Sequence, residues 1–241
     1  MEHVSKTLRE LSLAHPNTEP APAASPVWQP RLDAYEPSLV LALAAATRFV
    51  ADMAMAHEPR WLTFAGVCGC GKTFLALQIF AQAEHHNPGN PKRNPIWPSD
   101  WATSPRTSLD GFRRPRCVWM TANQFAARMR GGDYQLPEYL AEDFLVAIDD
   151  IGAARDTTNF IADALYRLCN VRLGRWTLFT TNLTLGDIEA QIDGRVASRL
   201  IRDANSMVDI DAGDYALRPH RAKQHPATSQ SSTSTSAPES P

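Results

Sequence analysis

A glycine-rich turn interrupts the apolar stretch WLTFAGVCGCGKTFLALQIF, residues 61–80, and carries a single lysine. Its central part, GVCGCGKT, fits the pattern G-x-x-x-x-G-K-[ST], with Gly66, Gly71, Lys72 and Thr73 at the fixed positions. Glycines let the backbone curl so that its N–H groups form a concave anion site. The lysine adds a flexible positive charge, and the threonine hydroxyl is a ligand for Mg²⁺. The turn therefore predicts a site for the phosphates of a nucleoside triphosphate.

The turn lies where such a site requires it, after a β-rich run and before a helical pattern. We expect a helix over KTFLALQIFAQAEH, whose positive dipole end would point at the same phosphates. The predicted nucleotide-binding residues are consecutive along the turn and the start of this helix: Gly66, Val67, Cys68, Gly69, Cys70, Gly71, Lys72, Thr73 and Phe74.

Two adjacent carboxylates end the apolar run FLVAIDDIG further along the chain. A buried strand does not end in such a pair unless cations or solvent meet it. Asp149, at the tip of the strand, is predicted to hold Mg²⁺ together with Thr73. Asp150 is predicted to orient or deprotonate the attacking water, and a helix cap or a solvated charge is the alternative interpretation. Because aspartate is shorter than glutamate, slow hydrolysis is compatible with this pair.

A third polar group follows the apolar run of WTLFTTNL. Asn182 can donate a hydrogen bond to a γ-phosphate or position water without adding negative charge, and an ordinary turn residue is the alternative. Together the three motifs predict three loops at the carboxyl edge of one parallel sheet, where such folds bind ligands.

Short β-rich runs alternate with helical patterns along the chain, which predicts an α/β fold with a parallel sheet and helices on both faces. The folded domain is expected to span residues 35–218. The five expected strands are Trp61–Ala65, Cys117–Thr121, Phe144–Ile148, Thr177–Thr181 and Met207–Ile210.

The other segments have the composition of linkers and tails. Residues 1–34 are predicted to be flexible, with a short helical pattern of Val4, Leu8 and Leu11 that either docks a partner or frays. Residues 219–241 are low in complexity and too polar to pack. Residues 87–116 form a long, proline-rich insertion, and a loop of this kind is usually functional or disordered.

Composition limits the classes of partner. The 241 residues are 44% hydrophobic and carry a formal net charge of −2, so nucleic-acid contacts must come from local basic patches. The four cysteines lack the paired spacing of zinc ligands, which favours reduced thiols. The N-terminus has no signal-peptide layout, and Leu39–Ala56 is interrupted by Arg48 and Asp52. We therefore expect a core helix there rather than a membrane span, in a soluble cytoplasmic protein.

Two arginines lie in GDIEAQIDGRVASRLIRD, after the fourth expected strand. Arg195 and Arg199 are four residues apart, on one side of a predicted helix. An arginine in this position can reach the γ-phosphate held by an adjacent subunit, and a surface arginine paired with an acid is the alternative. The apolar residues of this helix, expected to face the core, are Ile188, Ile192, Val196 and Leu200.

In their order and spacing, these motifs resemble the initiator clade of AAA+ ATPases. The resemblance rests on GVCGCGKTFLA, FLVAIDDIG, LYRLCNVRLGRWTLFTTNL and GRVASRL, and it covers roughly residues 35–218. Within the clade, the chain is most similar to DnaC-type helicase loaders of bacteria and phages and to IstB-type ATP-binding subunits of transposition systems. The resemblance implies a P-loop fold of three layers, αβα, with a five-stranded parallel sheet and no separate helical lid.

The resemblance also implies residue roles. The chain would bind ATP and Mg²⁺, with Thr73 and Asp149 as the metal ligands. The catalytic residues would be Asp150, Asn182 and Arg199, the last acting on a neighbouring subunit in an ATP-dependent homo-oligomer. Arg218 falls where the family has an aromatic–arginine ending, so it is expected near the nucleotide. Two features depart from the family, namely the long 87–116 insertion and a reduced N-terminal module.

Single-stranded DNA is the ligand that the resemblance implies for the segment between the second and third strands. Arg128 and Arg130, followed by Gly131 and Gly132, are the candidate phosphate contacts, and a solvated face is the alternative. The 87–116 insertion mixes tryptophans with arginines, as sequence-tolerant single-strand binders do, although tryptophans in long loops also fold back onto their own domain.

The leading functional hypothesis is an ATP-hydrolysing factor that assembles on single-stranded DNA and loads or remodels a replicative helicase. One alternative is an ATP-dependent selector of target DNA that partners a transposase. Another is a nucleotide-gated interaction module with little turnover. A small-molecule kinase is a weaker possibility, because it would leave the arginine motif unexplained.

Overall fold

Five parallel strands form one sheet in the computed structural model, which describes residues 37–87, 115–154 and 158–215. Along the sheet the order is β2-β3-β4-β1-β5, so the chain crosses over between neighbouring strands as in a doubly wound α/β fold. The predicted strands are all present, although β3 continues beyond Ile148. Their bounds are β1 (Trp61–Gly66), β2 (Cys117–Thr121), β3 (Leu145–Ile151), β4 (Trp176–Thr181) and β5 (Ser206–Ile210).

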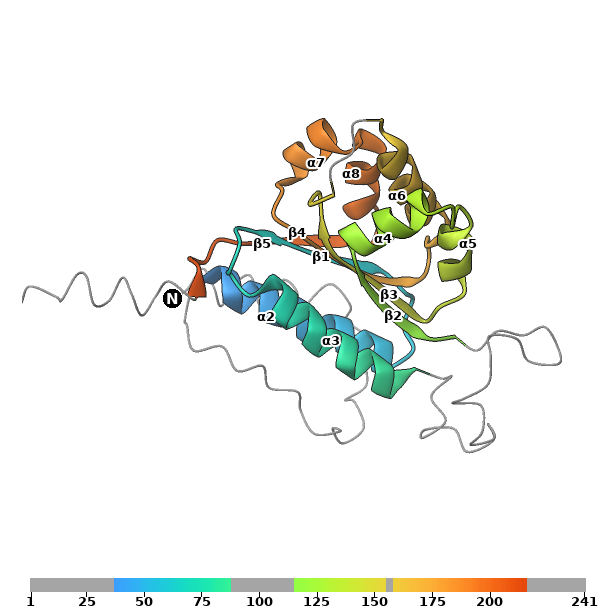
Figure 1. Cartoon of the computed structure of the whole chain (residues 1–241). Coiled ribbons are helices and arrows are strands. Elements are labelled where there is room, and N and C mark those ends of the chain that lie inside the picture. Colours follow the sequence, from blue (N-terminus) through green and yellow to red (C-terminus); the bar gives the residue numbers. More distant parts are fainter. Residues whose placement is uncertain (1–36, 88–114, 155–157, 216–241) are drawn as a thin grey trace, which may run out of the picture. The chain divides into compact units, whose positions relative to one another are not determined.

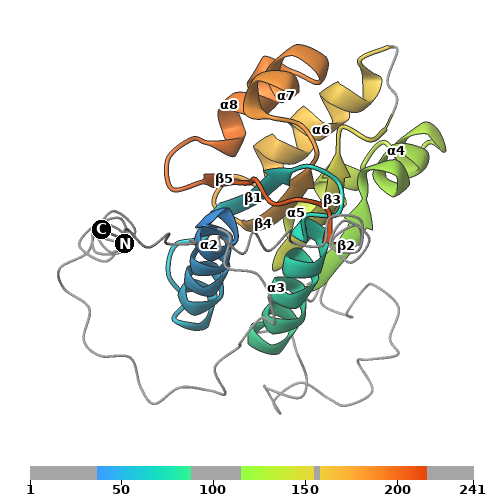
Figure 2. The ribbon, with the colours of Figure 1, turned by 90° about the vertical axis from the view of Figure 1, so that its left-hand side faces the viewer.

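Helices cover both faces of this sheet, which gives the three layers that were predicted (Figures 1 and 2). One face carries α2 (Pro37–Ala54) and α3 (Lys72–His86). The other face carries α4 (Ala122–Arg130), α6 (Phe160–Val171), α7 (Leu185–Gln191) and α8 (Gly194–Leu200), and α5 (Leu136–Ala141) packs against α6. The described residues include no further helical unit after β5. The predicted segments 1–34 and 219–241, Arg218 and most of the insertion lie outside the described residues.

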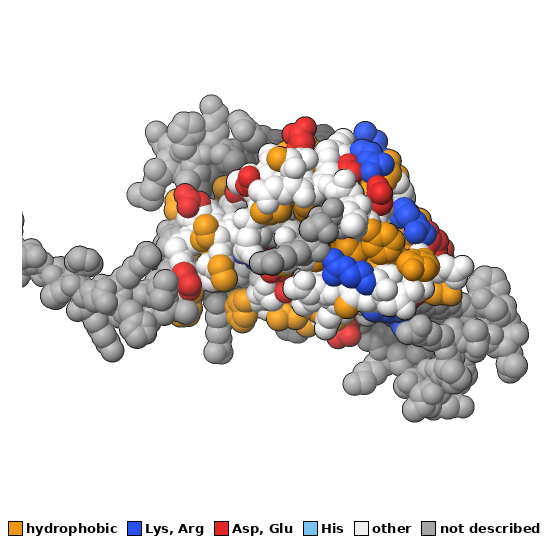
Figure 3. Space-filling view, turned by 45° about the horizontal axis from the view of Figure 1, so that its top comes forward, with side chains coloured by type: hydrophobic (Ala, Val, Ile, Leu, Met, Phe, Trp, Pro, Cys, Tyr) orange, Lys and Arg blue, Asp and Glu red, His pale blue; other side chains and the backbone are white. Residues whose placement is uncertain are grey.

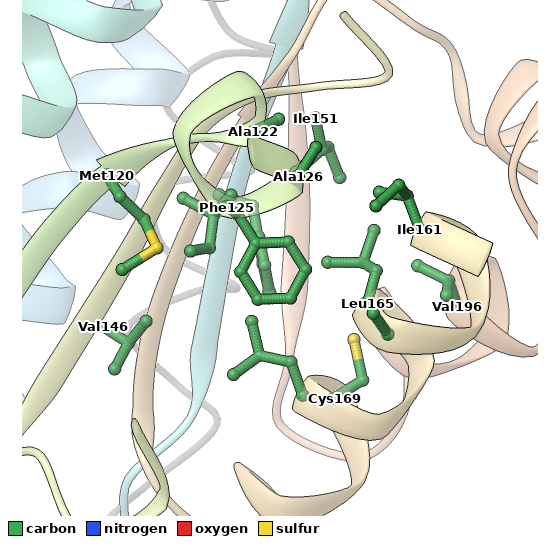
Figure 4. Packing of buried hydrophobic residues seen from close by; sticks show 14 of the residues in the cluster. Met120, Ala122, Phe125, Ala126, Val146, Ile151, Ile161, Leu165, Cys169 and Val196 are labelled. Atoms are coloured by element: carbon green, nitrogen blue, oxygen red, sulfur yellow. The ribbon is translucent and has the colours of Figure 1, made fainter. Parts of the chain in front are cut away.

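A cluster of buried apolar residues fills the space between the sheet and α4, α6 and α8 (Figure 4). Phe125 of α4 lies between Val146 of β3 and Leu165 of α6, and its exposed fraction is 1%. Burial of an apolar side chain of this size contributes about 1.5–3 kcal/mol, so this packing fixes α4 and α6 to the strands that end in the candidate site.

Helix α2 is long and apolar enough, by length and composition, to cross a membrane. In the fold, one side of this helix packs on α3, β1 and β5, and Ala42, Ala46 and Phe49 are buried there. The ring of Phe49 meets that of Trp176 edge to face, with centroids 5.0 Å apart. Packing against the sheet accounts for the apolar composition of α2, in agreement with the predicted core helix.

The single helix predicted around Arg195 and Arg199 is wrong, because the structure divides it into α7 and α8. Asp193, between the two, has extended backbone, and its carboxylate accepts a 2.6 Å hydrogen bond from the backbone N–H of Arg195. This side-chain cap starts α8, and α7 has already ended at Gln191. Ile188, Val196 and Leu200 are nevertheless fully buried, as the apolar repeat predicted.

Candidate nucleotide-binding site

The glycine turn between β1 and α3 is held closely against the chain that follows β5. A Cβ atom on Gly66, whose φ is +146°, would lie 2.4 Å from the carbonyl oxygen of Ile210. A Cβ atom on Gly69, whose φ is +77°, would lie 2.3 Å from the carboxylate of Asp214. The carbonyl of Gly69 also accepts a 3.0 Å hydrogen bond from the backbone N–H of Tyr215. Both positions therefore require glycine for backbone conformation and for space.

Lys72, the first residue of α3, is buried, with an exposed fraction of 6%. Its Nζ donates hydrogen bonds of 2.8 Å to the carbonyl oxygens of Gly66 and Val67 and to Oδ1 of Asn182. Among the described residues, no carboxylate lies within 4.0 Å of this ammonium group. Lys72 is thus a buried cation with no carboxylate at ion-pair distance in this part of the chain, which is an environment that favours an anionic ligand.

The surroundings of Lys72 fit phosphate groups in shape as well as in charge. A Cβ atom on Gly71 would meet no atom within 4 Å, so the turn is open above this residue. Helix α3 begins at the turn, and the unpaired N–H groups of its first residues add positive potential there. The side chains of Val67, Cys68 and Phe74 are exposed around this opening. The nine residues predicted to bind nucleotide therefore form this turn and the start of α3, and Cys70 and Lys72 are the buried ones among them.

Asp149 and Asp150 lie in a β-bulge at the end of β3. Ile148 pairs with Phe179 and Ile151 pairs with Thr181, so two residues of β3 are opposite Thr180 alone. Oδ1 of Asp149 accepts hydrogen bonds from the hydroxyls of Thr73, at 2.9 Å, and Thr180, at 2.6 Å. The bulge brings the first acidic residue to the glycine turn, as bulges beside functional sites often do.

Thr73 and Asp149 are the residues predicted to hold Mg²⁺, and their side-chain oxygens are in direct contact. Hydroxyl and carboxylate oxygens are the hard ligands that Mg²⁺ prefers. Within the described ranges, no group of three or more histidine, cysteine, aspartate or glutamate side chains is arranged to hold a metal ion. The pair therefore fits a cation that completes its shell with phosphate oxygens and water rather than one enclosed by protein.

Asp150 has a left-handed backbone conformation, with φ +60°, and its carboxylate faces Asn182. Oδ1 of Asp150 accepts a 2.6 Å hydrogen bond from Nδ2 of Asn182. Burial and the neighbouring charge of Asp149 raise the pKa of Asp150, while Lys72 acts in the opposite direction. Helix α6 is preceded by Asn159 at its N-cap position, so the alternative interpretation of Asp150 as a helix cap does not fit the fold.

Asn182 connects the two charged parts of the site, because its amide oxygen binds Lys72 and its amide nitrogen binds Asp150. An ordinary turn residue does not make two such contacts. The structure thus brings together Lys72, Thr73, Asp149, Asp150 and Asn182, which the sequence placed on three separate motifs.

Arg199 lies apart from these residues, near the amino edge of the sheet. Its carbonyl accepts a 2.8 Å hydrogen bond from Asn205, whose amide oxygen accepts another from the backbone N–H of Trp61, the first residue of β1. The glycine turn follows the other end of β1, and six extended residues span about 20 Å. The guanidinium of Arg199 is therefore too far away to reach the turn of its own chain.

Arg195 and Arg199 differ in their partners. Arg195 forms ion pairs with Asp163, at 2.8 Å, and Asp193, at 2.7 Å, and it lies over the ring of Tyr166. The half-buried Arg199 donates from Nε and Nη2 to Oδ1 of Asn170, at 3.2 and 2.8 Å. No carboxylate of the described residues lies within 4.0 Å of Arg199. The alternative interpretation as an acid-paired surface arginine thus describes Arg195 and not Arg199.

The candidate DNA contacts lie at the turn between α4 and α5. Nε of Arg128 donates a 3.0 Å hydrogen bond to the carboxylate of Asp133, and Arg130 is exposed. Beside them, the exposed ring of Tyr134 meets that of Phe160, with centroids 6.0 Å apart. Figure 3 shows basic and apolar side chains close together toward the right of this surface. Arginine beside exposed aromatic rings suits a single-stranded nucleic acid, although Arg128 is already paired with the carboxylate of Asp133.

The ends of the insertion are joined at the opposite edge of the sheet from the glycine turn. Nδ2 of Asn87, which follows α3, donates a 3.0 Å hydrogen bond to the carbonyl of Pro115, which precedes β2. The described residues on either side of positions 88–114 are therefore neighbours. Their predicted contribution to DNA binding stays a prediction.

Comparison with solved structures identifies the fold. The structure matches "Crystal structure of the DnaC helicase loader" with a TM-score of 0.51 and 18% identity, covering 77% of this chain and 94% of that one. It matches "Crystal Structure of the DnaI" with a TM-score of 0.52 and 19% identity, covering 76% of this chain and 87% of that one. It also matches a DNA replication initiation factor with a TM-score of 0.53 and 13% identity, covering 80% of this chain but only 53% of that one.

At identities this low, the likeness shows a shared fold. The fold class is therefore α/β, with a five-stranded parallel sheet and flanking helices, as the sequence predicted, and this fold is shared with the DnaC helicase loader and DnaI. The sequence itself matches no protein-family model and no curated protein.

Sequence reasoning missed two residues that contact the candidate site. Thr180 was expected only as part of a strand, yet its hydroxyl binds Asp149. Asp214 had no predicted role, yet its carboxylate lies against Gly69. A hydroxyl at the end of a strand next to an acidic strand end is a signal for the first. No local signal points to the second, because the contact depends on how the chain turns after β5.

Proposed function

We propose that this chain binds ATP with Mg²⁺ at the turn formed by residues 66–74 and hydrolyses it. The observation that carries the proposal is the environment of Lys72, a buried cation at a helix start whose partners in the described structure are neutral. Phosphate oxygens would supply the negative charge that the described part of the chain does not place at ion-pair distance from Lys72.

Each side chain of the proposed site has a definite task. Lys72 exchanges its contact with Asn182 for phosphate oxygens, and the freed Oδ1 of Asn182 can then accept a hydrogen bond from the attacking water. The second N–H of its amide nitrogen, whose first is bound to Asp150, can donate to the γ-phosphate. Asp150, at the far side of the same amide, accepts the proton of that water. Thr73 and Asp149 hold Mg²⁺, which when bound neutralises charge on the phosphates.

Completion of the site by a second copy is part of the proposal. Arg199 is remote from the turn of its own chain and has no acidic partner among the described residues, which supports a role in the site of a neighbouring copy. An arginine supplied in this way stabilises the charge that develops on the phosphates. ATP would then hold adjacent copies together in a homo-oligomer.

For the biological role, we propose an ATP-dependent, cytoplasmic factor that assembles on single-stranded DNA and loads or remodels a replicative helicase. The support is the fold shared with the DnaC helicase loader, together with the arginines and aromatic rings at the α4–α5 turn. The alternative with a transposase as partner uses the same site and the same surface.

A nucleotide-gated module with little turnover is favoured by one observation. Asn182 already satisfies Asp150 with a 2.6 Å hydrogen bond, so the acid must break this contact before it can accept a proton from water. In this version, ATP binding changes the surface offered to partners, and hydrolysis is slow.

Titration with a fluorescent ATP analogue tests the binding site. We expect saturable, Mg²⁺-dependent binding by the wild-type chain and none by Lys72→Ala, with an unchanged circular dichroism spectrum and thermal midpoint. Arg202→Ala, which removes an exposed cation after α8, is the matched control and should bind normally. Retained affinity in Lys72→Ala would remove the assignment of the turn.

Steady-state hydrolysis with and without single-stranded DNA separates the active enzyme from the passive module. DNA-stimulated turnover that Asp150→Ala abolishes supports the enzyme, and turnover at the background level in both proteins supports the module. Affinity capture with Asp150→Ala in ATP then distinguishes the partners. Recovery of a replicative helicase supports helicase loading, and recovery of a transposase supports the alternative.

A further inference from the structure

The two acidic residues of β3 can both serve one site only because the strand is irregular. In a regular strand, consecutive side chains point to opposite faces of the sheet. Here Asp149 contacts Thr73, at the start of α3, while Asp150 contacts Asn182, after β4. Both partners lie at the carboxyl edge of the sheet, so the bulge turns a pair of opposed carboxylates into a pair that shares this edge.

Thr180 is the residue of β4 that lies opposite the bulge, and it binds both members of the acidic pair. Its hydroxyl donates a 2.6 Å hydrogen bond to Oδ1 of Asp149. The hydroxyl oxygen of Thr180 also accepts a 2.8 Å hydrogen bond from the backbone N–H of Asp150. Thr180 is almost completely buried, with an exposed fraction of 1%, so water does not replace these bonds easily.

These two bonds act on a strained part of the backbone. Asp150 has a φ of +60°, a conformation that is unfavourable for residues other than glycine and persists when its surroundings hold it in place. The bond from its N–H to Thr180 holds the peptide in this conformation. The bond to Asp149 orients that carboxylate toward Thr73, at the start of α3.

The adjacent residue of β4 provides a comparison. Thr181 is also fully buried, and its hydroxyl donates to the carbonyl of Ile151, at 2.8 Å, and accepts from the N–H of Leu183, at 3.0 Å. These bonds join backbone groups beyond the bulge and do not involve either carboxylate. Thr181 therefore resembles Thr180 in type, burial and number of hydrogen bonds but not in what it touches.

We propose that Thr180 is a positioning residue that holds the bulge of β3, orients the carboxylate of Asp149 for Mg²⁺ and fixes the backbone of Asp150. This inference rests on the proposed nucleotide site. It adds to that site a residue that does not contact the ligand but orients the residues that do. A partner that orients a metal ligand typically changes metal affinity by about 10–100-fold.

The experiment uses the full chain and three variants, Thr180→Val, Thr180→Ser and Thr181→Val. Valine keeps the shape of threonine without the hydroxyl, serine keeps the hydroxyl, and Thr181→Val controls for loss of a buried hydroxyl nearby. Affinity for a fluorescent ATP analogue is measured in Mg²⁺ and in EDTA. We expect Thr180→Val to bind about tenfold or more weakly in Mg²⁺ and normally in EDTA, while the other two variants behave as wild type.

Hydrogen exchange of the Asp150 amide in the ligand-free chain gives a second readout that needs no nucleotide. Protection should be lost in Thr180→Val and kept in Thr180→Ser and Thr181→Val. Unchanged exchange and unchanged Mg²⁺ dependence in Thr180→Val would overturn the inference, and so would an equal loss of affinity in Mg²⁺ and EDTA. Absence of nucleotide binding by the wild-type chain would instead contradict the proposed function, and the exchange result would still decide whether Thr180 holds the bulge.

Discussion

The amide oxygen of Asn182 accepts a 2.8 Å hydrogen bond from the ammonium group of Lys72, a residue 110 positions earlier in the chain. The amide nitrogen of the same side chain donates to Asp150. A neutral side chain thus separates a buried cation from a carboxylate whose pKa is raised by burial. This arrangement keeps Lys72 available, because a carboxylate in the place of the amide would form an ion pair with it.

Substitution of Asn182 by aspartate tests this separation. The change preserves the shape of the side chain but places a negative charge 2.8 Å from Nζ of Lys72 and close to Asp150. The new ion pair would compete with phosphate, so we expect nucleotide affinity to fall by about tenfold or more. Equilibrium titration with a fluorescent ATP analogue measures the effect.

Asn182→Ala is the matched variant, because it removes the amide without adding charge. It should lose much less affinity than Asn182→Asp while still losing turnover. Equal affinity losses in the two variants would show that the neutrality of residue 182 is unimportant.

The pH dependence of turnover should report the raised pKa of Asp150. Burial and the charge of Asp149 favour the protonated form of Asp150, so the carboxyl stays protonated to higher pH than an ordinary aspartate, whose pKa is about 3.9. A base must be deprotonated to act, so kcat should fall as the pH is lowered through this raised pKa. Initial rates across the acidic range at saturating ATP measure the position of this decline.

Asp150→Asn gives the control for the pH profile, because asparagine cannot titrate. Its residual turnover should be low and should lack the acidic decline. A profile of unchanged shape in Asp150→Asn would assign the titration to another group and remove Asp150 from the role of base.

The fold was predictable because its signals are local. Each buried strand reads as an apolar run, and the spacing of glycines around Lys72 identifies the turn without any knowledge of distant contacts. The extension of β3 was not predictable in this way. Its last residues belong to the strand only through the shifted pairing with β4, where the backbone N–H of Asp150 donates to the hydroxyl of Thr180.

Long-range contacts also decide the roles of residues that look ordinary in the sequence. Arg172 has no predicted role, yet it is fully buried. Its guanidinium donates to carbonyls of two separate segments, those of Leu140 and Asp143 around the end of α5 and that of Trp176 in β4. In the same way, the difference between Arg195 and Arg199 comes from Asp163 and Asn170 on α6, which no spacing rule links to α8.

Arg199 and Arg195 form a matched pair for testing a site shared between copies. Arg199→Ala should leave ATP binding intact and lower turnover by roughly 10³-fold, because the arginine acts only on the developing charge of a neighbour's nucleotide. Arg195→Ala removes exposed ion pairs within its own chain and should change turnover by no more than about twofold.

Mixing two inactive variants tests whether the arginine acts on another copy. Lys72→Ala retains Arg199, and Arg199→Ala retains an intact glycine turn. Mixed oligomers should therefore recover part of the wild-type turnover, although neither variant is active alone. If the turnover of the mixture only equals the summed turnovers of the two variants measured alone, Arg199 does not act on the nucleotide of another copy.

Asp133 is expected to restrain DNA binding at the α4–α5 turn. Its carboxylate holds the side chain of Arg128 in an exposed ion pair, and such pairs are weak enough to be exchanged for a phosphate. Asp133→Asn removes the competing charge, so affinity for single-stranded DNA should rise by about two- to fivefold and should depend more steeply on salt. Fluorescence anisotropy with a labelled oligonucleotide at several salt concentrations, in the presence of ATP, measures both effects. The double variant Asp133→Asn/Arg128→Ala should lose the gain, whereas a gain that persists without Arg128 would mean that the DNA follows another surface.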